Sequence, residues 1–210
     1  MKTQTSSKEI VLIMSKLPKL YIIAGCNGAG KTTASFTILP EVLNCKEFIN
    51  ADEIAKGLSP FQPESVAVQA GRIMLARMDE LLQKRETFAF ETTLATKSYK
   101  QKIEWAQANG YEVTLLFFWL DSPNIAKKRV AQRVAEGGHN IPLETIERRY
   151  YNGIANLFTI YIDIVDICYI FDNSEGRKEL IAQKERHKDI VIYNNDKFNL
   201  MKNNDERGNN

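Results

Sequence analysis

Apolar runs alternate along the chain with segments of helical spacing. The first run, residues 20–24, is continuously apolar, rich in β-branched side chains and closed by Gly25. This pattern is typical of a strand that is buried on both faces of a parallel sheet. Four later runs have the same character, and a short final strand is expected near the C-terminus. The predicted strands after the first are residues 47–50, 87–90, 113–120, 165–171 and 190–193.

Helical patterns separate these strands. Apolar side chains recur at helical spacing between residues 66 and 82, and a second helix is predicted to begin near Lys97 and to end at Asn109. Ser122 supplies an N-cap for a third helix, with Pro123 in its first turn. Strands that alternate with helices predict an α/β fold.

The length of 210 residues predicts one domain with modest additions. We expect an N-terminal extension over residues 1–18, a folded domain over residues 19–195 and a disordered tail over residues 196–210. Residues 136–142 contain two glycines and a proline within a basic helical stretch. This composition predicts a hinged helical lid near residues 129–150.

The charge balance gives little reason to expect a polyanionic partner. The chain has 28 basic and 26 acidic residues, a net charge of +2, which disfavours nucleic acid as its substrate. Its three cysteines show no C-x-x-C spacing and indicate reduced thiols. The apolar stretch at residues 10–14 is too short to span a bilayer. We therefore expect a cytoplasmic protein without a membrane partner.

A glycine-rich loop follows the first predicted strand. It matches the pattern G-x-x-x-x-G-K-T and precedes residues 33–39, which can form a helix. The chemistry needs glycines because several backbone N–H groups must turn inward around phosphate oxygens, in conformations that a Cβ would obstruct. The motif in this context predicts a P-loop nucleotide-binding fold, an α/β three-layer sandwich with a parallel central sheet and a helical lid.

The loop assigns roles to its own side chains. Lys31 is expected to reach the β- and γ-phosphates of ATP, and the Thr32 hydroxyl is expected to bind Mg²⁺. A turn that merely connects strand to helix is disfavoured, because the strand, the helix and the Lys-Thr pair are all in place. The predicted ATP-binding residues are Gly25, Asn27, Gly28, Ala29, Gly30, Lys31, Thr32 and Thr33.

Carboxylates follow two of the other predicted strands. Asp52 comes after residues 47–50, and Glu91 comes directly after residues 87–90. Substrates of doubly wound sheets gather at the carboxyl ends of the strands, where a kinase needs a carboxylate to orient and deprotonate an acceptor hydroxyl. The alternative interpretation of Asp52 is a helix N-cap, which is compatible with a catalytic role, and that of Glu91 is a solvated rim residue.

Two further polar residues at strand ends are ambiguous. Asp121 precedes Ser122 and is better explained by helix capping, so it is left out of the site. Asn173 is a candidate for the nucleotide base pocket, although a turn explains it equally well.

Four arginines flank the predicted lid. Guanidinium groups suit the charge that spreads over a moving phosphoryl group. Each arginine is open to a second interpretation as part of a solvated helical face. The candidates are Arg129, Arg133, Arg148 and Arg149.

Four segments carry a family resemblance, namely residues 21–33, 50–55, 91–93 and 137–150. Many families share the phosphate loop, so the other three segments discriminate between them. Over roughly residues 19–175 the chain resembles the zeta-toxin family of P-loop kinases, in its compact bacterial form.

The resemblance implies a kinase that uses ATP or GTP to phosphorylate a sugar hydroxyl of UDP-N-acetylglucosamine. It implies a general-base role for Asp52 and a sugar contact for Glu91, with which we group Thr92 as an acceptor-binding residue. It also implies contacts from Arg133 and Arg149 to the phosphates. Members of the family are often neutralised by a small antitoxin protein, which makes such a protein a candidate partner.

Two other classes of function compete with a small-molecule kinase. A polynucleotide or RNA kinase would use the same loop, but the cluster Lys97, Lys100 and Lys102 falls short of a dense basic stripe with interleaved aromatic residues. A nucleotide-dependent binding module would need neither Asp52 nor the arginines of the lid. The sequence therefore favours phosphoryl transfer to a small-molecule hydroxyl.

Overall fold

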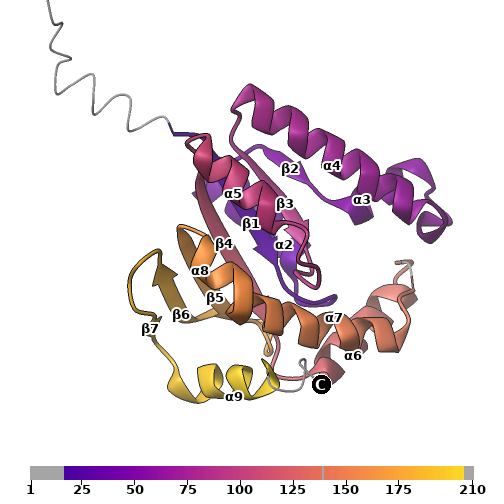
Figure 1. The fold of residues 1–210 in the computed structure, drawn as a ribbon. Coiled ribbons are helices and arrows are strands. Elements are labelled where there is room, and N and C mark those ends of the chain that lie inside the picture. Colours follow the sequence, from indigo (N-terminus) through magenta and orange to yellow (C-terminus); the bar gives the residue numbers. More distant parts are fainter. Residues whose placement is uncertain (1–16, 139, 206–210) are drawn as a thin grey trace, which may run out of the picture.

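A mostly parallel sheet forms the centre of the computed structural model, which describes residues 17–138 and 140–205 (Figure 1). Within these residues the sheet has seven strands in the order β2-β3-β1-β4-β5-β6-β7. The first five strands pair in parallel, and β6 pairs antiparallel with both β5 and β7. The strands are β1 (Lys19–Ala24), β2 (Glu47–Ile49), β3 (Phe88–Thr92), β4 (Glu112–Trp119), β5 (Ile167–Asp172), β6 (Glu179–Glu185) and β7 (Val191–Ile192).

The apolar runs explain the central strands. Residues 20–24 of β1 and 113–119 of β4 are buried throughout, as expected for strands that are covered on both faces. The predicted α/β fold with a parallel central sheet is thus confirmed. Strand β6 was not predicted, because this antiparallel strand near the edge carries polar side chains and lacks a continuous apolar run.

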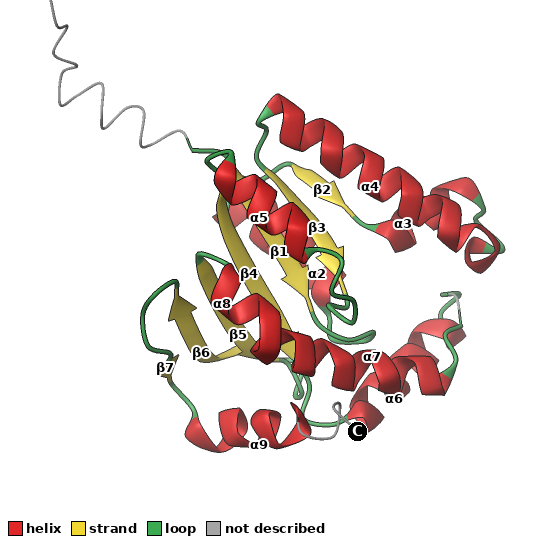
Figure 2. Cartoon of the chain, in the orientation of Figure 1, coloured by secondary structure: helices red, strands yellow, loops and turns green. Residues whose placement is uncertain are grey.

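Helices connect the parallel strands, and α5 crosses in front of the sheet in Figure 2. Short 3₁₀ and π segments occupy Pro63–Val66, Ile38–Val42 and Leu157–Tyr161. No helix in the described part of the chain combines the length and the apolar character needed to cross a membrane. The α-helices are α2 (Lys31–Thr37), α3 (Ala51–Leu58), α4 (Ala67–Lys84), α5 (Lys100–Ala108), α6 (Pro123–Ala135), α7 (Leu143–Asn156), α8 (Ile162–Ile164) and α9 (Asn195–Asp205).

Helix α7 is hydrogen-bonded to the segments that follow two strands. The buried hydroxyl of Tyr150 donates to the carbonyl of Leu120 at 2.7 Å and accepts a hydrogen bond from Trp119 Nε1 at 3.2 Å. One and a half turns further on, Asn156 Nδ2 donates to the carbonyl of Leu94 at 2.9 Å. Because buried hydrogen bonds are costly to break without replacement, α7 is a fixed part of the domain.

These hydrogen bonds of α7 exclude that helix from the mobile part of the predicted lid. Residues 129–150 comprise the end of α6, a connection over residues 136–142 and the first half of α7. Gly137 has a φ of +93°, a left-handed conformation that favours glycine. His139 lies outside the described residues. We therefore limit the predicted closing motion to the end of α6 and the connection.

The C-terminal region differs from the expected disordered tail. Residues 195–205 form α9, and its residues Phe198 and Met201 are buried against the domain. The Phe198 ring meets the ring of Phe158 edge-on, with centroids 5.8 Å apart. The expectation of disorder over these residues failed because α9 is mostly polar, and only two buried apolar side chains, about one turn apart, attach it to the domain.

We expect Phe198→Ala to destabilise the fold by about 3 kcal/mol, because the substitution removes a buried aromatic side chain. The matched control is Leu200→Ala on the same helix. Leu200 is 46% exposed, and its loss should change stability by less than about 0.5 kcal/mol. Urea unfolding measures both values. Equal midpoints for the two variants would show that α9 is not docked through Phe198.

Candidate active site

The phosphate loop leaves β1 at Ala24 and enters α2 at Lys31, as the motif predicted. Two of its glycines are required by their surroundings as well as by their positive φ angles. A Cβ on Gly25 would lie 2.2 Å from the carbonyl oxygen of Phe118, and one on Gly30 would lie 2.6 Å from Asn173 Nδ2. The loop therefore packs closely against the backbone of β4 at Phe118 and against the Asn173 side chain that follows β5.

Lys31 points into the loop. Its ammonium group donates to the carbonyl oxygen of Cys26 at 3.0 Å and lies 3.4 Å from Glu91 Oε1. The side chain is only 6% exposed, yet Lys31 lines a cleft of about 480 Å³ above the loop. A buried ammonium group inside a phosphate loop is in position to contact phosphate oxygens.

Glu91 faces the phosphate loop as well. It is the next-to-last residue of β3, which pairs with β1 so that Glu91 lies opposite Ile23. Its Oε2 atom accepts a hydrogen bond from Thr32 Oγ1 at 2.7 Å and another from Asn50 Nδ2 at 2.9 Å. The interpretation of Glu91 as a solvated rim residue is therefore wrong, since its side chain is 10% exposed and both of its carboxylate oxygens contact polar side chains.

Asp52 lies in the first turn of α3, but it does not cap that helix. The cap is Asn50, whose Oδ1 atom accepts hydrogen bonds from the backbone N–H groups of Asp52 and Glu53 at 2.8 and 3.4 Å. The alternative interpretation of Asp52 as an N-cap is thus wrong. Asp52 lines both the cleft above the phosphate loop and a second pocket of about 200 Å³.

Thr92 is not placed for acceptor binding. It is buried, its hydroxyl accepts a hydrogen bond from the backbone N–H of Leu94 at 3.0 Å, and it lines neither cavity. The pairing of Thr92 with Glu91 as acceptor-binding residues therefore needs correction. A strand alternates its side chains between opposite faces, so neighbours at its end do not share one site.

Asn173 lies at the edge of the cleft, where sequence alone left two interpretations open. Its Nδ2 atom donates to the carbonyl oxygen of Ala29 at 2.9 Å, and Oδ1 is buried without a hydrogen-bond partner among the described residues. Asn173 lines the cleft together with Gly176 and Lys178. The side chain thus supports the phosphate loop and borders the cavity at the same time.

The four arginines have different roles. Arg129 donates to the carbonyl oxygens of Asn173 at 2.9 Å and Ser174 at 2.8 Å, and more weakly to that of Gly28 at 3.4 Å. It therefore clamps the phosphate loop to the segment after β5. Arg148 is exposed and lines neither cavity.

Arg133 and Arg149, which the family resemblance assigned to the phosphates, each line a cavity, and Arg129 lines the cleft as well. Arg133 lines the cleft, and its buried Nε and Nη2 atoms have no hydrogen-bond partner among the described residues. Arg149 lines the smaller pocket and donates to Asn27 Oδ1 at 3.1 Å. Burial lowers the pKa of Arg149, and the Asp52 carboxylate opposes that shift. Unpaired buried guanidinium nitrogens call for an anionic ligand.

The donor atoms fit a magnesium nucleotide. The Thr32 hydroxyl and the Glu91 carboxylate offer hard oxygen atoms beside the phosphate loop. Within residues 17–138 and 140–205 there is no group of three His, Cys, Asp or Glu side chains that could hold a metal by themselves. Mg²⁺ suits such a site because it usually keeps several waters and shares its ligands with substrate phosphates.

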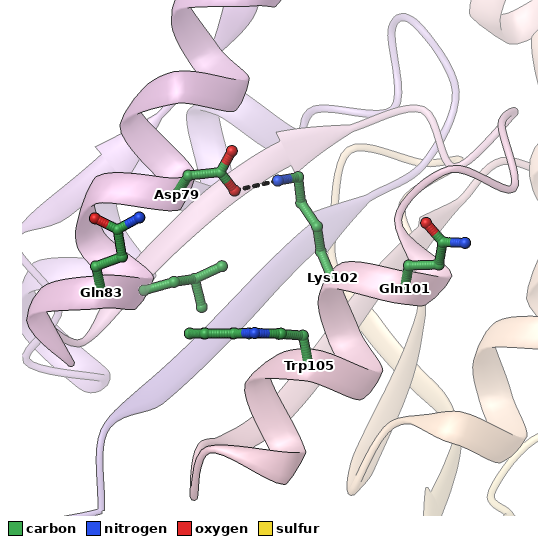
Figure 3. A pocket seen from close by; sticks show the side chains of 6 residues that line it. Asp79, Gln83, Gln101, Lys102 and Trp105 are labelled. Carbon is green, nitrogen blue, oxygen red and sulfur yellow. Dashed lines mark hydrogen bonds and ion pairs between the residues drawn. The ribbon is translucent and has the colours of Figure 1, made fainter.

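A third cavity lies between α4 and α5 (Figure 3). It measures about 310 Å³ and shares no lining residue with the cleft above the phosphate loop. Figure 3 shows the Lys102 ammonium group paired with Asp79 and the flat Trp105 ring beside them. The paired charges leave no free acid, base or nucleophile there, so we place no chemistry in this cavity.

Comparisons with known proteins agree with this architecture. The family model described as "Zeta toxin" matches residues 3–198. An uncharacterized protein of Haemophilus influenzae is 29% identical over 132 residues, which cover 63% of this chain and 92% of that protein.

Two solved structures share the fold at low sequence identity. A chain from the PezAT chromosomal toxin-antitoxin system of Streptococcus pneumoniae has a TM-score of 0.64 and 15% identity, over 99% of this chain and 98% of that one. A chain from the AvrRxo1-ORF1:-ORF2 complex crystallised with ATP has a TM-score of 0.70 and 15% identity, over 91% of this chain. The match spans 65% of that longer chain. Family and fold together agree with a site that has the parts of a nucleotide-dependent kinase.

The two arginines of α6 should respond differently to truncation. Arg129→Ala removes a charged donor from three carbonyl oxygens and should destabilise the ligand-free protein by about 2 kcal/mol. Arg133→Ala removes a guanidinium group that has unpaired nitrogens, so it should leave stability unchanged or slightly higher. Thermal unfolding without nucleotide compares them. An equal loss in both variants would contradict the distinction between clamp and ligand-binding arginine.

Proposed function

This chain belongs to the Zeta toxin family, and on that premise we propose that it is a kinase that moves the γ-phosphoryl group of ATP to a hydroxyl of a small molecule. One observation carries the proposal. Asp52 lies between the cleft above the phosphate loop and the smaller pocket, and it lines both. In-line phosphoryl transfer needs an acceptor hydroxyl that faces the γ-phosphate of the donor and lies within hydrogen-bond reach of a carboxylate that takes its proton.

The donor side is formed by the phosphate loop. Backbone N–H groups of residues 25–32 and the Lys31 ammonium group hold the phosphates of ATP, with GTP as the alternative donor. Thr32 and Glu91 would hold Mg²⁺, which supplies charge neutralisation on the phosphate oxygens when it is bound. Arg133 meets the transferring group from the lid side, where its unpaired nitrogens gain acceptors.

The acceptor side is the pocket of about 200 Å³ between α3, the start of α4 and the connection from α6 to α7. Asp52 takes the proton of the acceptor hydroxyl as its oxygen attacks, and Arg149 stabilises the carboxylate and nearby phosphoryl charge. The pocket also presents Glu64, Asn140 and Thr145, polar groups that suit hydroxyl recognition.

The family suggests the acceptor, namely UDP-N-acetylglucosamine. The pocket is small, so a nucleotide sugar would place its sugar ring there and extend its diphosphate and base outside. Two carboxylates in this pocket, Asp52 and Glu64, disfavour a polynucleotide acceptor because they repel its phosphates. A nucleotide-dependent binding module would have no use for a carboxylate between two cavities.

A small antitoxin protein is the partner that we propose. The support is the membership of the family and the likeness to a chain from the PezAT toxin-antitoxin system. An antitoxin would act most directly by covering the cleft above the phosphate loop.

We expect Asp52→Asn to lower kcat by about 100-fold or more while the affinity for ATP changes little, because the amide keeps the shape but cannot accept a proton. Purified protein with ATP, Mg²⁺ and a panel of nucleotide sugars and free sugars is assayed for phosphate transfer by mass spectrometry. The neighbouring control is Glu53→Gln, since Glu53 pairs with Lys56 at the surface. Full activity of Asp52→Asn would remove Asp52 from the chemistry.

A further inference from the structure

Asn50 occupies the junction between β2 and α3. The residue has an extended backbone and is 6% exposed, so its polar side chain is buried among the site residues. Buried amide groups need partners for both their donor and their acceptor atoms. In Asn50 each end of the amide contacts a different part of the site.

The amide oxygen of Asn50 caps the helix that carries the proposed base. Asn50 Oδ1 accepts hydrogen bonds from the backbone N–H groups of Asp52 at 2.8 Å and Glu53 at 3.4 Å, which fixes the first turn of α3. The Asp52 carboxylate itself has no hydrogen-bond partner among the residues that the structure describes. Its position therefore depends on the backbone that Asn50 caps.

The amide nitrogen of Asn50 is linked to the phosphate loop through Glu91. Asn50 Nδ2 donates to Glu91 Oε2, the same oxygen atom that accepts from the Thr32 hydroxyl. The other oxygen of Glu91 lies 3.4 Å from the Lys31 ammonium group. A continuous path of hydrogen bonds thus runs from Thr32 through Glu91 and Asn50 to the backbone of Asp52, and the ion pair with Lys31 adds a second link from Glu91 to the phosphate loop.

We propose that Asn50 is a positioning residue that sets the distance of Asp52 from the phosphate loop and couples the two. This inference rests on the proposed function, in which Asp52 acts as the base. An amide suits the position because it accepts from two N–H groups through Oδ1 and donates to a carboxylate through Nδ2, whereas a serine hydroxyl has one oxygen for both tasks. An aspartate would cap the helix equally well but would repel Glu91.

The chain contains a matched control for this role. Asn194 caps the start of α9, where its Oδ1 atom accepts from the backbone N–H of Lys197 at 3.1 Å, and its Nδ2 atom donates to Glu179 Oε1 at 2.8 Å. The same pair of hydrogen bonds to a helix start and a glutamate therefore occurs at a position that lines neither site cavity. Substitutions at Asn194 measure the loss of capping and pairing without an effect on the site.

The experiment compares Asn50→Asp and Asn50→Ser with Asn194→Asp and Asn194→Ser. Aspartate keeps the cap and adds a charge, whereas serine keeps a capping oxygen without one, and neither can donate to the glutamate as the amide does. We expect both Asn50 variants to lose about 100-fold in kcat, because a small displacement of a catalytic group is that costly, with KM for ATP nearly unchanged. The Asn194 variants should keep the wild-type kcat.

A second measurement needs no acceptor. Hydrogen exchange of residues 51–58 is followed with and without Mg²⁺ and a non-hydrolysable ATP analogue. In the wild type and the Asn194 variants, the analogue should slow exchange in α3, because its binding orders the path through Glu91. In the Asn50 variants this slowing should disappear while the analogue still binds.

The outcomes separate the two hypotheses. If the wild type transfers phosphate to no hydroxyl, the proposed function fails, and the exchange of α3 still decides whether Asn50 couples the loop to the helix. If the wild type is active but the Asn50 variants match the Asn194 variants in kcat and in analogue-induced protection, Asn50 is only a cap and the inference is overturned.

Discussion

The carboxylate of Glu91 is the interaction on which the site depends. It is 10% exposed, and burial of a carboxylate is costly unless charges and donors compensate for it. Lys31, Thr32 and Asn50 provide that compensation from two different segments. The parallel pairing of β1 with β3 brings the phosphate loop beside Glu91, and the neighbouring pairing of β2 with β3 brings Asn50 to its other side. The order β2-β3-β1 in the sheet therefore determines that donor-side and base-side residues meet at one buried anion.

A second constraint fixes the lid side of the cleft. Helix α7 is held through Tyr150 and Asn156, and Arg129 of α6 clamps the loop after β5 to the phosphate loop. Arg133 lies on α6 beyond Arg129, and its buried Nε and Nη2 atoms have no hydrogen-bond partner among the described residues. On the proposed function, a phosphate ligand would supply the missing acceptors.

Much of this arrangement could be predicted from the sequence, because local patterns carried it. Continuous apolar runs marked the parallel strands, and the spacing of Gly25, Lys31 and Thr32 marked the loop. The sequence could not show which of Glu91 and Thr92 faces the phosphate loop, since that depends on which segments of the chain cover each face of β3. The sequence marks Asn50 only as the first residue of the segment 50–55 that carries the family resemblance. Its role rests on a contact with Glu91, 41 residues away in the chain, for which a single sequence gives no signal.

The smaller pocket shows how the fold could set specificity without changing the chemistry. Its walls come from α3, the start of α4 and the connection after α6, whereas the donor side is built from the phosphate loop and β3. Asp52 lines both cavities, so on the proposed function one carboxylate would serve different acceptors as the surrounding segments vary. Loops tolerate such variation better than the strands that they connect. Relatives with this sheet and phosphate loop would then differ in acceptor through residues 60–67 and 140–145, while the proposed path from Thr32 through Glu91 and Asn50 would hold the base at a constant distance from the phosphates.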